Sequence, residues 1–249
     1  MKRLILVYAL ASYALFGAVF VWLAAFLLNL GDMRGLATRP LPEAVAINLS
    51  LIALFGVVHS VMARPGFKRV WTKIIPPASE RATYVLQSSL LLGLIIWQWQ
   101  PIPTVIWQVD GPAVWPIHGA FILGALTVLT ATFLLGHFEF VGLSQAWNNL
   151  RGAPVPSAAF RTPMLYQIVR HPLQLGLLIM MIATPVMTLG HLIFVASMAL
   201  YIAIGLRFEE RALLREFGAA YAAYQRDVPM LFPRPFRRLR TASGGQRAD

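Results

Sequence analysis

The 249-residue sequence contains no cysteine and few charged residues. The absence of cysteine excludes disulfide bonds, thiolate zinc sites and a cysteine nucleophile, although it says little about the compartment. Charged residues make up 12% of the chain and hydrophobic residues 58%, whereas a soluble domain carries roughly twice that share of charge. Because a lipid-facing surface needs no polar cover, this composition favours a protein embedded in a membrane.

Acidic residues are scarcer than basic ones, so the formal net charge is +11. Such an excess of basic residues can indicate nucleic-acid binding. Here the basic residues lie beside long apolar segments, which is the pattern of cytoplasmic loops in membrane proteins. The charge therefore predicts membrane lipid as a partner and gives no support to a nucleic-acid partner.

Five apolar segments are long enough to predict membrane crossings, since a crossing takes about 20 mostly apolar residues. They are residues 4–30, 45–62, 82–99, 114–136 and 173–206. The first is too long for a signal peptide, and the last is broken at residues 184–191 into a tight hairpin of two helices. The sequence thus predicts an all-α fold, a polytopic integral membrane helix bundle of six transmembrane helices, or five if one segment lies at the interface.

The basic residues orient the bundle. They gather before the first helix, between the second and third, before the hairpin and in the C-terminal tail, whereas the other loops carry few. By the positive-inside rule both termini are predicted to be cytoplasmic, and the predicted location is the inner membrane. No internal repeat is visible. The predicted division is a four-helix transmembrane region (1–136), a module with the hairpin and a following interfacial helix (137–235) and a basic tail (236–249).

Polar residues stand at both ends of the predicted hairpin. Arg170 and His171 precede it, and Pro172 then suits the first turn of a helix. Glu209 and Glu210 follow its second helix. Because a hairpin brings its two ends together, we expect these side chains to share one pocket at the cytoplasmic surface. Taken singly, Arg170 could instead be a snorkelling anchor, and His171 a polar residue beside a helix cap.

The helix predicted after the hairpin adds aromatic side chains to this pocket. Intervals of four and three residues put five side chains on one face: Glu210, Leu214, Phe217, Tyr221 and Tyr224. Such a pocket suits a zwitterionic, purine-bearing, positively charged ligand. The alternative is an interfacial helix whose glutamate pairs with Arg207 or Arg211. Glu80 and Arg81 either pair with each other or line the mouth of the pocket.

The same residues resemble the cofactor module of the isoprenylcysteine carboxyl methyltransferase superfamily of integral membrane methyltransferases. The resemblance rests on "VRHPLQLG", the short hairpin and "FEERALLREFGAAYAAYQRDVPMLFP". In the N-terminal half, "HSVMARPGFK", "ERATYVLQSS" and "GHFEFVGLSQAW" are similar to the NnrU-like branch, and in particular to its bacterial methanethiol S-methyltransferases. The resemblance covers nearly the whole chain except the tail.

The resemblance implies methyl transfer from S-adenosylmethionine to the small volatile thiol methanethiol, giving dimethyl sulfide. It also implies the residues that surround the cofactor: Tyr166, Arg170, His171, Pro172, Gly176, Glu209, Glu210, Arg211, Tyr221 and Tyr224. The prenylcysteine enzymes usually have tyrosine where Gln174 stands and arginine where Met230 stands, and both departures favour a small thiol. A larger lipidic or prenylcysteine acceptor and a non-enzymatic membrane protein are the alternatives. The absence of a repeat argues against a transporter.

Thiolate rather than thiol is the nucleophile in such a transfer, so the site should offer a base or a positive field. His59 and His137 are the predicted catalytic bases, because both stand at cytoplasmic ends of helices and imidazole titrates near neutral pH. Each could instead be a hydrogen-bonded helix-end histidine. A metal or haem on these two and His171 is disfavoured by the lack of cysteine and of close histidine spacing. The sequence does not give the oligomeric state.

Overall fold

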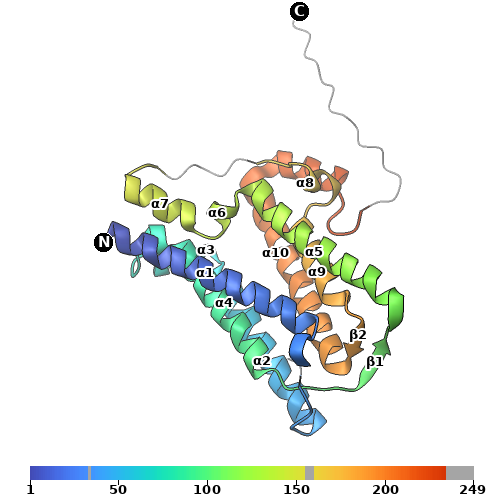
Figure 1. Ribbon diagram of the computed structural model, residues 1–249. Coiled ribbons are helices and arrows are strands. Elements are labelled where there is room, and N and C mark those ends of the chain that lie inside the picture. The colour runs from blue at the N-terminus through green and yellow to red at the C-terminus, as the bar shows by residue number, and fades with distance from the viewer. Residues whose placement is uncertain (33–34, 155–159, 234–249) are drawn as a thin grey trace, which may run out of the picture.

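The computed structural model describes residues 1–32, 35–154 and 160–233, so the predicted basic tail lies outside the described residues. The described chain is mostly helical (Figure 1). The helices are α1 (Lys2–Leu27), α2 (Leu41–Met62), α3 (Pro65–Trp71), α4 (Glu80–Gln98), α5 (Val114–Leu135), α6 (His137–Phe140), α7 (Leu143–Arg151), α8 (Leu165–Ile168), α9 (Pro172–Ile182) and α10 (Leu189–Asp227). Short 3-10 turns lie at Leu30–Asp32, Pro77–Ser79 and Gly111–Ala113.

Among the described residues, 4 helices are long and apolar enough to cross a membrane: α1, α2, α5 with the turn before it, and α10. The predicted mostly helical membrane bundle is confirmed in this form. The other two predicted segments are occupied by α4 and α9. Because α9 has 11 residues, it is roughly 16 Å long, about half the hydrocarbon thickness of a bilayer. Six crossings therefore stay a prediction.

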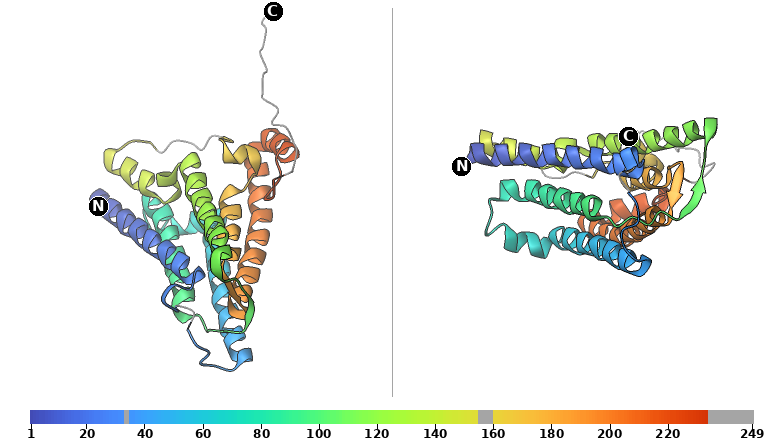
Figure 2. Two further views of the ribbon diagram at one scale, coloured as in Figure 1. Left: turned by 45° about the vertical axis from the view of Figure 1, so that its right-hand side comes forward. Right: turned by 60° about the horizontal axis from the view of Figure 1, so that its bottom comes forward.

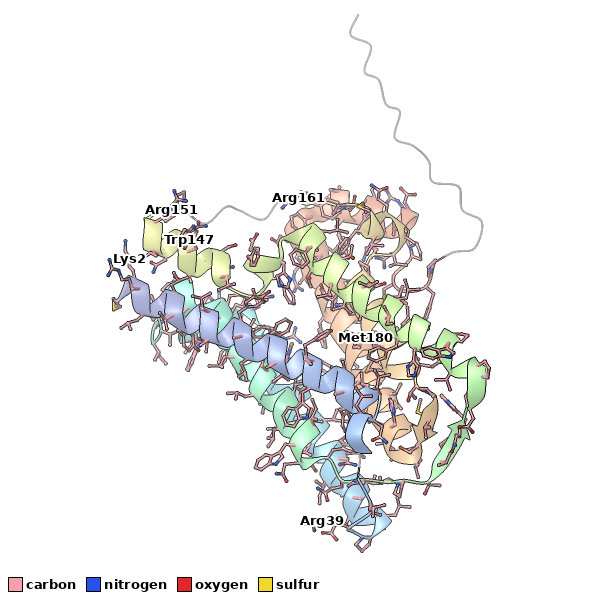
Figure 3. The ribbon with its side chains drawn as sticks, viewed as in Figure 1. Lys2, Arg39, Trp147, Arg151, Arg161 and Met180 are labelled. Carbon is pink, nitrogen blue, oxygen red and sulfur yellow. The ribbon has the colours of Figure 1, made fainter. Side chains whose placement is uncertain are left out.

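The charged segments gather at one end of the bundle. In the left view of Figure 2 the N-terminus, the segment around α7 and the last turns of α10 lie at one end, and β1 lies toward the other. Figure 3 shows the same separation, with Lys2, Arg151 and Arg161 at one end and Arg39 at the opposite end. This arrangement agrees with the distribution of basic residues on which the predicted orientation rests.

Close helix packing holds the hairpin against the rest of the bundle. The longest contact lies between α5 and α9, where Gly124 and Gly176 face each other. A Cβ atom at Gly176 would lie 2.7 Å from the Gly124 carbonyl oxygen, and one at Gly124 would lie 2.8 Å from the Gly176 oxygen. Small residues at a helix crossing in a membrane allow this backbone approach. The structure therefore places Gly176 at a helix contact.

Two short strands depart from the all-α prediction. β1 (Val105–Gln108) pairs antiparallel with β2 (Val186–Thr188), which lies within the predicted turn of the hairpin. Both strands contain the β-branched residues that favour extended structure. Thr188 then caps α10, because its side chain accepts a hydrogen bond from the backbone N–H of His191. The turn of the hairpin is thus tied to the loop that precedes α5.

The hairpin helix and the predicted interfacial helix form one continuous element. α10 runs for 39 residues and is interrupted only by a kink at Gly218, whose φ of 54° lies in the left-handed region. The apolar segment predicted from the sequence ends at residue 206, so the last turns of α10 lie beyond it. Glycine suits the kink because it adopts positive φ without a Cβ clash.

Candidate active site

Two distant segments pair beside the start of α9. The backbone N–H of Arg170 donates to the carbonyl of Pro229 (2.9 Å), and that of His171 donates to the carbonyl of Met230 (3.1 Å). Val169 is extended, three residues before the helix that begins at Pro172. The chain after α10 is thereby held against the entrance of the hairpin, which brings together both ends that the sequence predicted to meet.

Glu210 is the centre of a buried hydrogen-bond network. Arg170 donates to both of its carboxylate oxygens, from Nε to Oε1 at 2.8 Å and from Nη2 to Oε2 at 2.7 Å. Oε1 also lies 2.8 Å from His171 Nε2 and accepts a 2.8 Å bond from the Tyr221 hydroxyl. Oε2 accepts a 2.6 Å bond from Gln225 Nε2. Glu210 thus has a bidentate guanidinium and three further hydrogen-bond partners. Because they share one carboxylate, these side chains are held in fixed positions relative to one another.

The network decides the charge of Glu210. Burial alone raises the pKa of a carboxyl group, but hydrogen bonds from Arg170, His171, Tyr221 and Gln225 outweigh burial and lower the pKa of Glu210 to about 2. The glutamate is therefore ionised at neutral pH. Its side chain is only 9% exposed, so Glu210 and Arg170 form a buried ion pair. Removing either partner would leave the other as an unpaired buried charge.

A cavity of about 360 Å³ lies beside this network, between the ends of α4 to α6 and those of α8 to α10. Its polar wall carries Glu209, Arg170 and His171, and the Glu209 side chain is 48% exposed. The lining residues are Arg81, Ala131, Thr132, Leu135, Phe140, Phe160, Arg161, Tyr166, Arg170, His171, Leu173, Gln174, Glu209, Leu213, Phe217, Tyr221 and Tyr224. The cavity can therefore hold a ligand that carries charged groups of both signs.

Aromatic rings form one side of the cavity. The ring of Phe160 lies 5.3 Å from that of Phe217, 5.9 Å from Tyr221 and 5.5 Å from Tyr224, measured between centroids. The Tyr224 hydroxyl donates to the backbone carbonyl of Tyr166. Burial, with Glu209 nearby, raises the pKa of Tyr166 to about 12. These rings offer flat, neutral surfaces for a planar group.

The predicted cofactor-binding residues fall into two groups. Those that line the cavity are Tyr166, Arg170, His171, Glu209, Tyr221 and Tyr224. Of the others, Pro172 is buried at the start of α9 and Glu210 lies behind the wall. Arg211 is exposed and its guanidinium lies 5.9 Å from the ring centroid of Phe208, and Gly176 faces α5. Their predicted role at a cofactor stays a prediction.

The two predicted bases do not line the cavity. The Tyr84 hydroxyl lies 2.6 Å from Nε2 of His59. His137 is buried, with its Nε2 3.0 Å from the Tyr13 hydroxyl and its Nδ1 2.9 Å from Thr132 Oγ1. Burial lowers the pKa of His137, so its ring is neutral at neutral pH. Both histidines are hydrogen-bonded behind the wall, and their role as bases stays a prediction.

The structure adds residues that sequence patterns did not reveal. Phe160 reaches the cavity from an irregular segment, where no helical or strand period could indicate its direction. Gln225 bonds Glu210, and its place four residues after Tyr221 on a helix could have indicated this. Leu213 lines the cavity in place of the predicted Leu214, which is exposed. Among the described residues no group of three or more histidine, aspartate or glutamate side chains could hold a metal ion.

Comparison with known proteins identifies the family. The chain is 49% identical over 240 residues to methanethiol S-methyltransferase 2 of Bradyrhizobium diazoefficiens, which covers 95% of this chain and 93% of that relative. It is 44% identical over 245 residues to methanethiol S-methyltransferase of Mycobacterium tuberculosis, covering 95% of this chain and 99% of the relative. A Nurim homolog of Drosophila pseudoobscura pseudoobscura is 29% identical over 183 residues, which are 71% of this chain and 72% of that protein.

No protein-family model matches the chain, and no solved structure matches it. The resemblance that the motifs indicated is nevertheless confirmed by relatives that are similar over almost its full length. The chain belongs to the family of methanethiol S-methyltransferases.

Proposed function

We propose that this protein transfers the methyl group of S-adenosylmethionine to methanethiol, giving dimethyl sulfide, at the cavity between α4–α6 and α8–α10. The proposed location is the inner membrane, with the cavity on the cytoplasmic side. The observation that carries the proposal is a cavity with a carboxylate, guanidinium groups and an aromatic side, in a chain 49% identical to a relative named for this reaction.

The residues of the cavity fit the proposed cofactor in chemical type. S-adenosylmethionine carries an ammonium group, a carboxylate, a sulfonium and an adenine ring. Glu209 is the carboxylate among the described lining residues and suits the ammonium group, while Arg161 offers a guanidinium to the carboxylate. Phe217 and Tyr224 offer rings for the adenine. Glu210 would act indirectly, because its hydrogen bonds hold Arg170, His171 and Tyr221 in place.

For this reaction the protein must orient the cofactor and the acceptor, and it must favour the ionised form of the acceptor thiol. When bound, S-adenosylmethionine supplies a methyl group that is attached to a positively charged sulfur. An in-line displacement needs the acceptor sulfur about 3–3.5 Å from that methyl carbon, with the attacking and departing sulfurs aligned. The rigid Glu210 network fixes the wall on which the cofactor would be oriented. The apolar lining by Ala131 and Leu135 would exclude water.

The size of the cavity favours a small acceptor. Pockets for small molecules range over about 300–1,000 Å³. This cavity, at about 360 Å³, lies at the lower end of that range. Under the proposed function it must hold both the nucleoside cofactor and the acceptor. Little volume would remain for a prenyl chain. Methanethiol adds only one carbon and one sulfur atom, so the volume favours the small thiol over the lipidic acceptor.

Headspace gas chromatography tests the proposal. Detergent-purified protein with S-adenosylmethionine and methanethiol is expected to release dimethyl sulfide, and His171→Ala should release at least tenfold less because one of the groups that hold Glu210 and line the cavity is removed. No dimethyl sulfide from the wild type, together with calorimetric binding of S-adenosylhomocysteine, would replace the small thiol by a larger acceptor. No product and no binding would overturn the methyltransferase proposal.

A further inference from the structure

Among the described residues, the wall of the cavity opposite the proposed cofactor residues contains one charged group. This wall is built by the start of α4 and by α5 and α6, and its members are Arg81, Ala131, Thr132, Leu135 and Phe140. Ala131, Leu135 and Phe140 are apolar, and Thr132 is bonded to His137. A guanidinium thus stands on an otherwise apolar surface, in the half of the chain whose motifs distinguish the small-thiol branch.

The guanidinium of Arg81 is fixed by its neighbours. Its Nε donates a 2.6 Å hydrogen bond to the backbone carbonyl of Phe140. Its central carbon lies 5.1 Å from the ring centroid of Tyr84 and 5.0 Å from that of Phe140. Gly142, at a φ of +89°, allows this contact, because a Cβ there would lie 2.6 Å from the Ala82 backbone nitrogen. The approach of α7 to α4 therefore depends on a glycine.

The remaining donors of Arg81 are available to a ligand. Among the contacts of the described residues, only Nε of Arg81 donates a hydrogen bond. The adjacent Glu80 pairs instead with Lys68, at 3.5 Å between Nζ and Oε1. In contrast, Arg170 on the other wall donates its hydrogen bonds to Glu210 and to backbone carbonyls. Among the described lining residues, Arg81 is therefore the guanidinium that is both held in place and free to bind an anion in the cavity.

The geometry points to Arg81 as a catalytic residue that binds the acceptor sulfur and stabilises its thiolate form. The inference rests on the proposed function and names the group that ionises the acceptor. It also offers a reason why neither His59 nor His137 lines the cavity: a positive field lowers the free energy of the thiolate and makes a base at the sulfur unnecessary. The apolar surroundings strengthen that field, because the local dielectric constant is low.

The step balances in atoms and charge. The S–H bond of methanethiol breaks, and the proton passes to water at the mouth of the cavity. A lone pair of the thiolate then forms the new bond to the methyl carbon. The bond between that carbon and the sulfonium sulfur breaks, and its electron pair stays on the departing sulfur. A thiolate and a sulfonium become two neutral thioethers, so Arg81 holds dimethyl sulfide less strongly than thiolate and favours its release.

The charged and titratable groups around Arg81 have both signs. Tyr84 lies on α4, the helix that also carries Arg81, and its hydroxyl is hydrogen-bonded to His59 of α2. Glu209 from α10 lines the same cavity, and Arg161 and His171 line it as well. Glu209 would be occupied by the ammonium group of the cofactor under the proposed function. The acceptor would then meet the positive charge of Arg81 without a facing carboxylate.

The test is the pH dependence of kcat at saturating methanethiol and S-adenosylmethionine, because kcat reports the groups that ionise in the enzyme–substrate complex. It is measured on wild type, Arg81→Gln, Arg81→Lys and the control Arg69→Gln. Arg69 is exposed on α3 and does not line the cavity, so its variant removes one positive charge elsewhere. The affinity of each protein for S-adenosylhomocysteine is measured by calorimetry. The pKa of free methanethiol is measured in the same buffer.

We expect kcat of the wild type to rise with pH and to level off at a pH below the pKa of the free thiol. The rising part of this profile is the limb that is compared between variants. Arg81→Gln should move this limb upward by at least one pH unit and lower kcat at pH 7 at least tenfold, since a nearby opposite charge shifts a pKa by about 1–3 units. Arg81→Lys should keep the limb within about half a unit of the wild type. Binding of S-adenosylhomocysteine should stay within twofold in all variants.

Three results would overturn the inference while the proposed function stands. They are a wild-type limb at the pKa of the free thiol, a limb that Arg81→Gln leaves in place, and a loss of S-adenosylhomocysteine binding in Arg81→Gln. The last would make Arg81 a cofactor anchor. The wild-type limb gives an answer even if Arg81→Gln fails to fold. Absence of dimethyl sulfide from the wild type would instead overturn the proposed function and this inference together.

Discussion

Replacing Glu210 with glutamine is expected to lower the free energy of unfolding by roughly 3 kcal/mol at neutral pH. The pKa of this carboxyl group falls from 4.5 to about 2 in the folded protein, and one pKa unit corresponds to about 1.4 kcal/mol. Glutamine resembles the protonated acid, so the substitution removes the stabilisation that ionisation provides. Arg170 would also lose its buried partner, which is costly in itself.

The sign of the pH dependence follows from the lowered pKa. Above pH 4.5 the carboxylate is ionised in both the folded and unfolded states, and the stabilisation is complete. As the pH falls from 4.5 toward 2, the unfolded state binds the proton first, and the stabilisation is lost. The wild type should therefore lose stability over this range, and Glu210→Gln should lose less.

Thermal unfolding of the detergent-purified variants, followed by intrinsic fluorescence, measures this effect. Glu216→Gln is the matched control, because Glu216 lies on the same helix but is exposed and its replacement should change the unfolding free energy by at most about 0.5 kcal/mol. Equal midpoints for the two variants at neutral pH would show that the Glu210 network does not hold this part of the protein together.

Replacing Glu209 with glutamine is expected to weaken the binding of S-adenosylhomocysteine about 10- to 100-fold. Glu209 and Glu210 are adjacent in sequence but differ in surroundings. Glu210 is 9% exposed and hydrogen-bonded by four side chains, whereas Glu209 is 48% exposed at the cavity and lies 3.9 Å from Nδ1 of His171. A hydrogen bond between charged groups contributes about 1.5–3 kcal/mol, which corresponds to this loss of affinity.

Calorimetric titration with S-adenosylhomocysteine measures the loss, and Glu216→Gln again provides the control. Because Glu209 is half exposed, its replacement should leave the thermal unfolding midpoint near that of the wild type. The two substitutions are thus expected to have different effects. Glu210→Gln should lower the unfolding free energy, and Glu209→Gln should lower the affinity for S-adenosylhomocysteine. A Glu209→Gln protein that binds within twofold of the wild type would remove Glu209 from the cofactor site.

Local patterns predicted the long apolar helices of this fold, because apolar segments and flanking charges are properties of the sequence itself. The 173–206 segment predicted a hairpin, and the hairpin alone was sufficient to predict that Arg170 and Glu210 meet. The bidentate contact between them confirms that these residues meet. What they do there could not be predicted, since two adjacent glutamates on one helix take opposite roles only once their neighbours are known.

Other features depend on contacts between distant segments. The kink at Gly218 turns the last part of α10, and a single glycine in a helical pattern does not give its direction. The sequence left open whether Arg81 pairs with Glu80 or lines the mouth of the pocket. Arg81 lines the cavity, where Gly142 brings the α6–α7 segment against α4. The pairing of β1 with β2 joins segments about 80 residues apart, with no signal beyond a few β-branched residues.

A structure of the detergent- or lipid-embedded protein with S-adenosylhomocysteine bound would locate the cofactor site directly. We expect the ligand in the cavity beside the Glu210 network, with its amino group at Glu209, its adenine among the rings of Phe217 and Tyr224, and its sulfur directed toward Arg81. A ligand bound elsewhere in the chain would contradict the proposed site, and a sulfur turned away from the α4–α6 wall would contradict the role of Arg81.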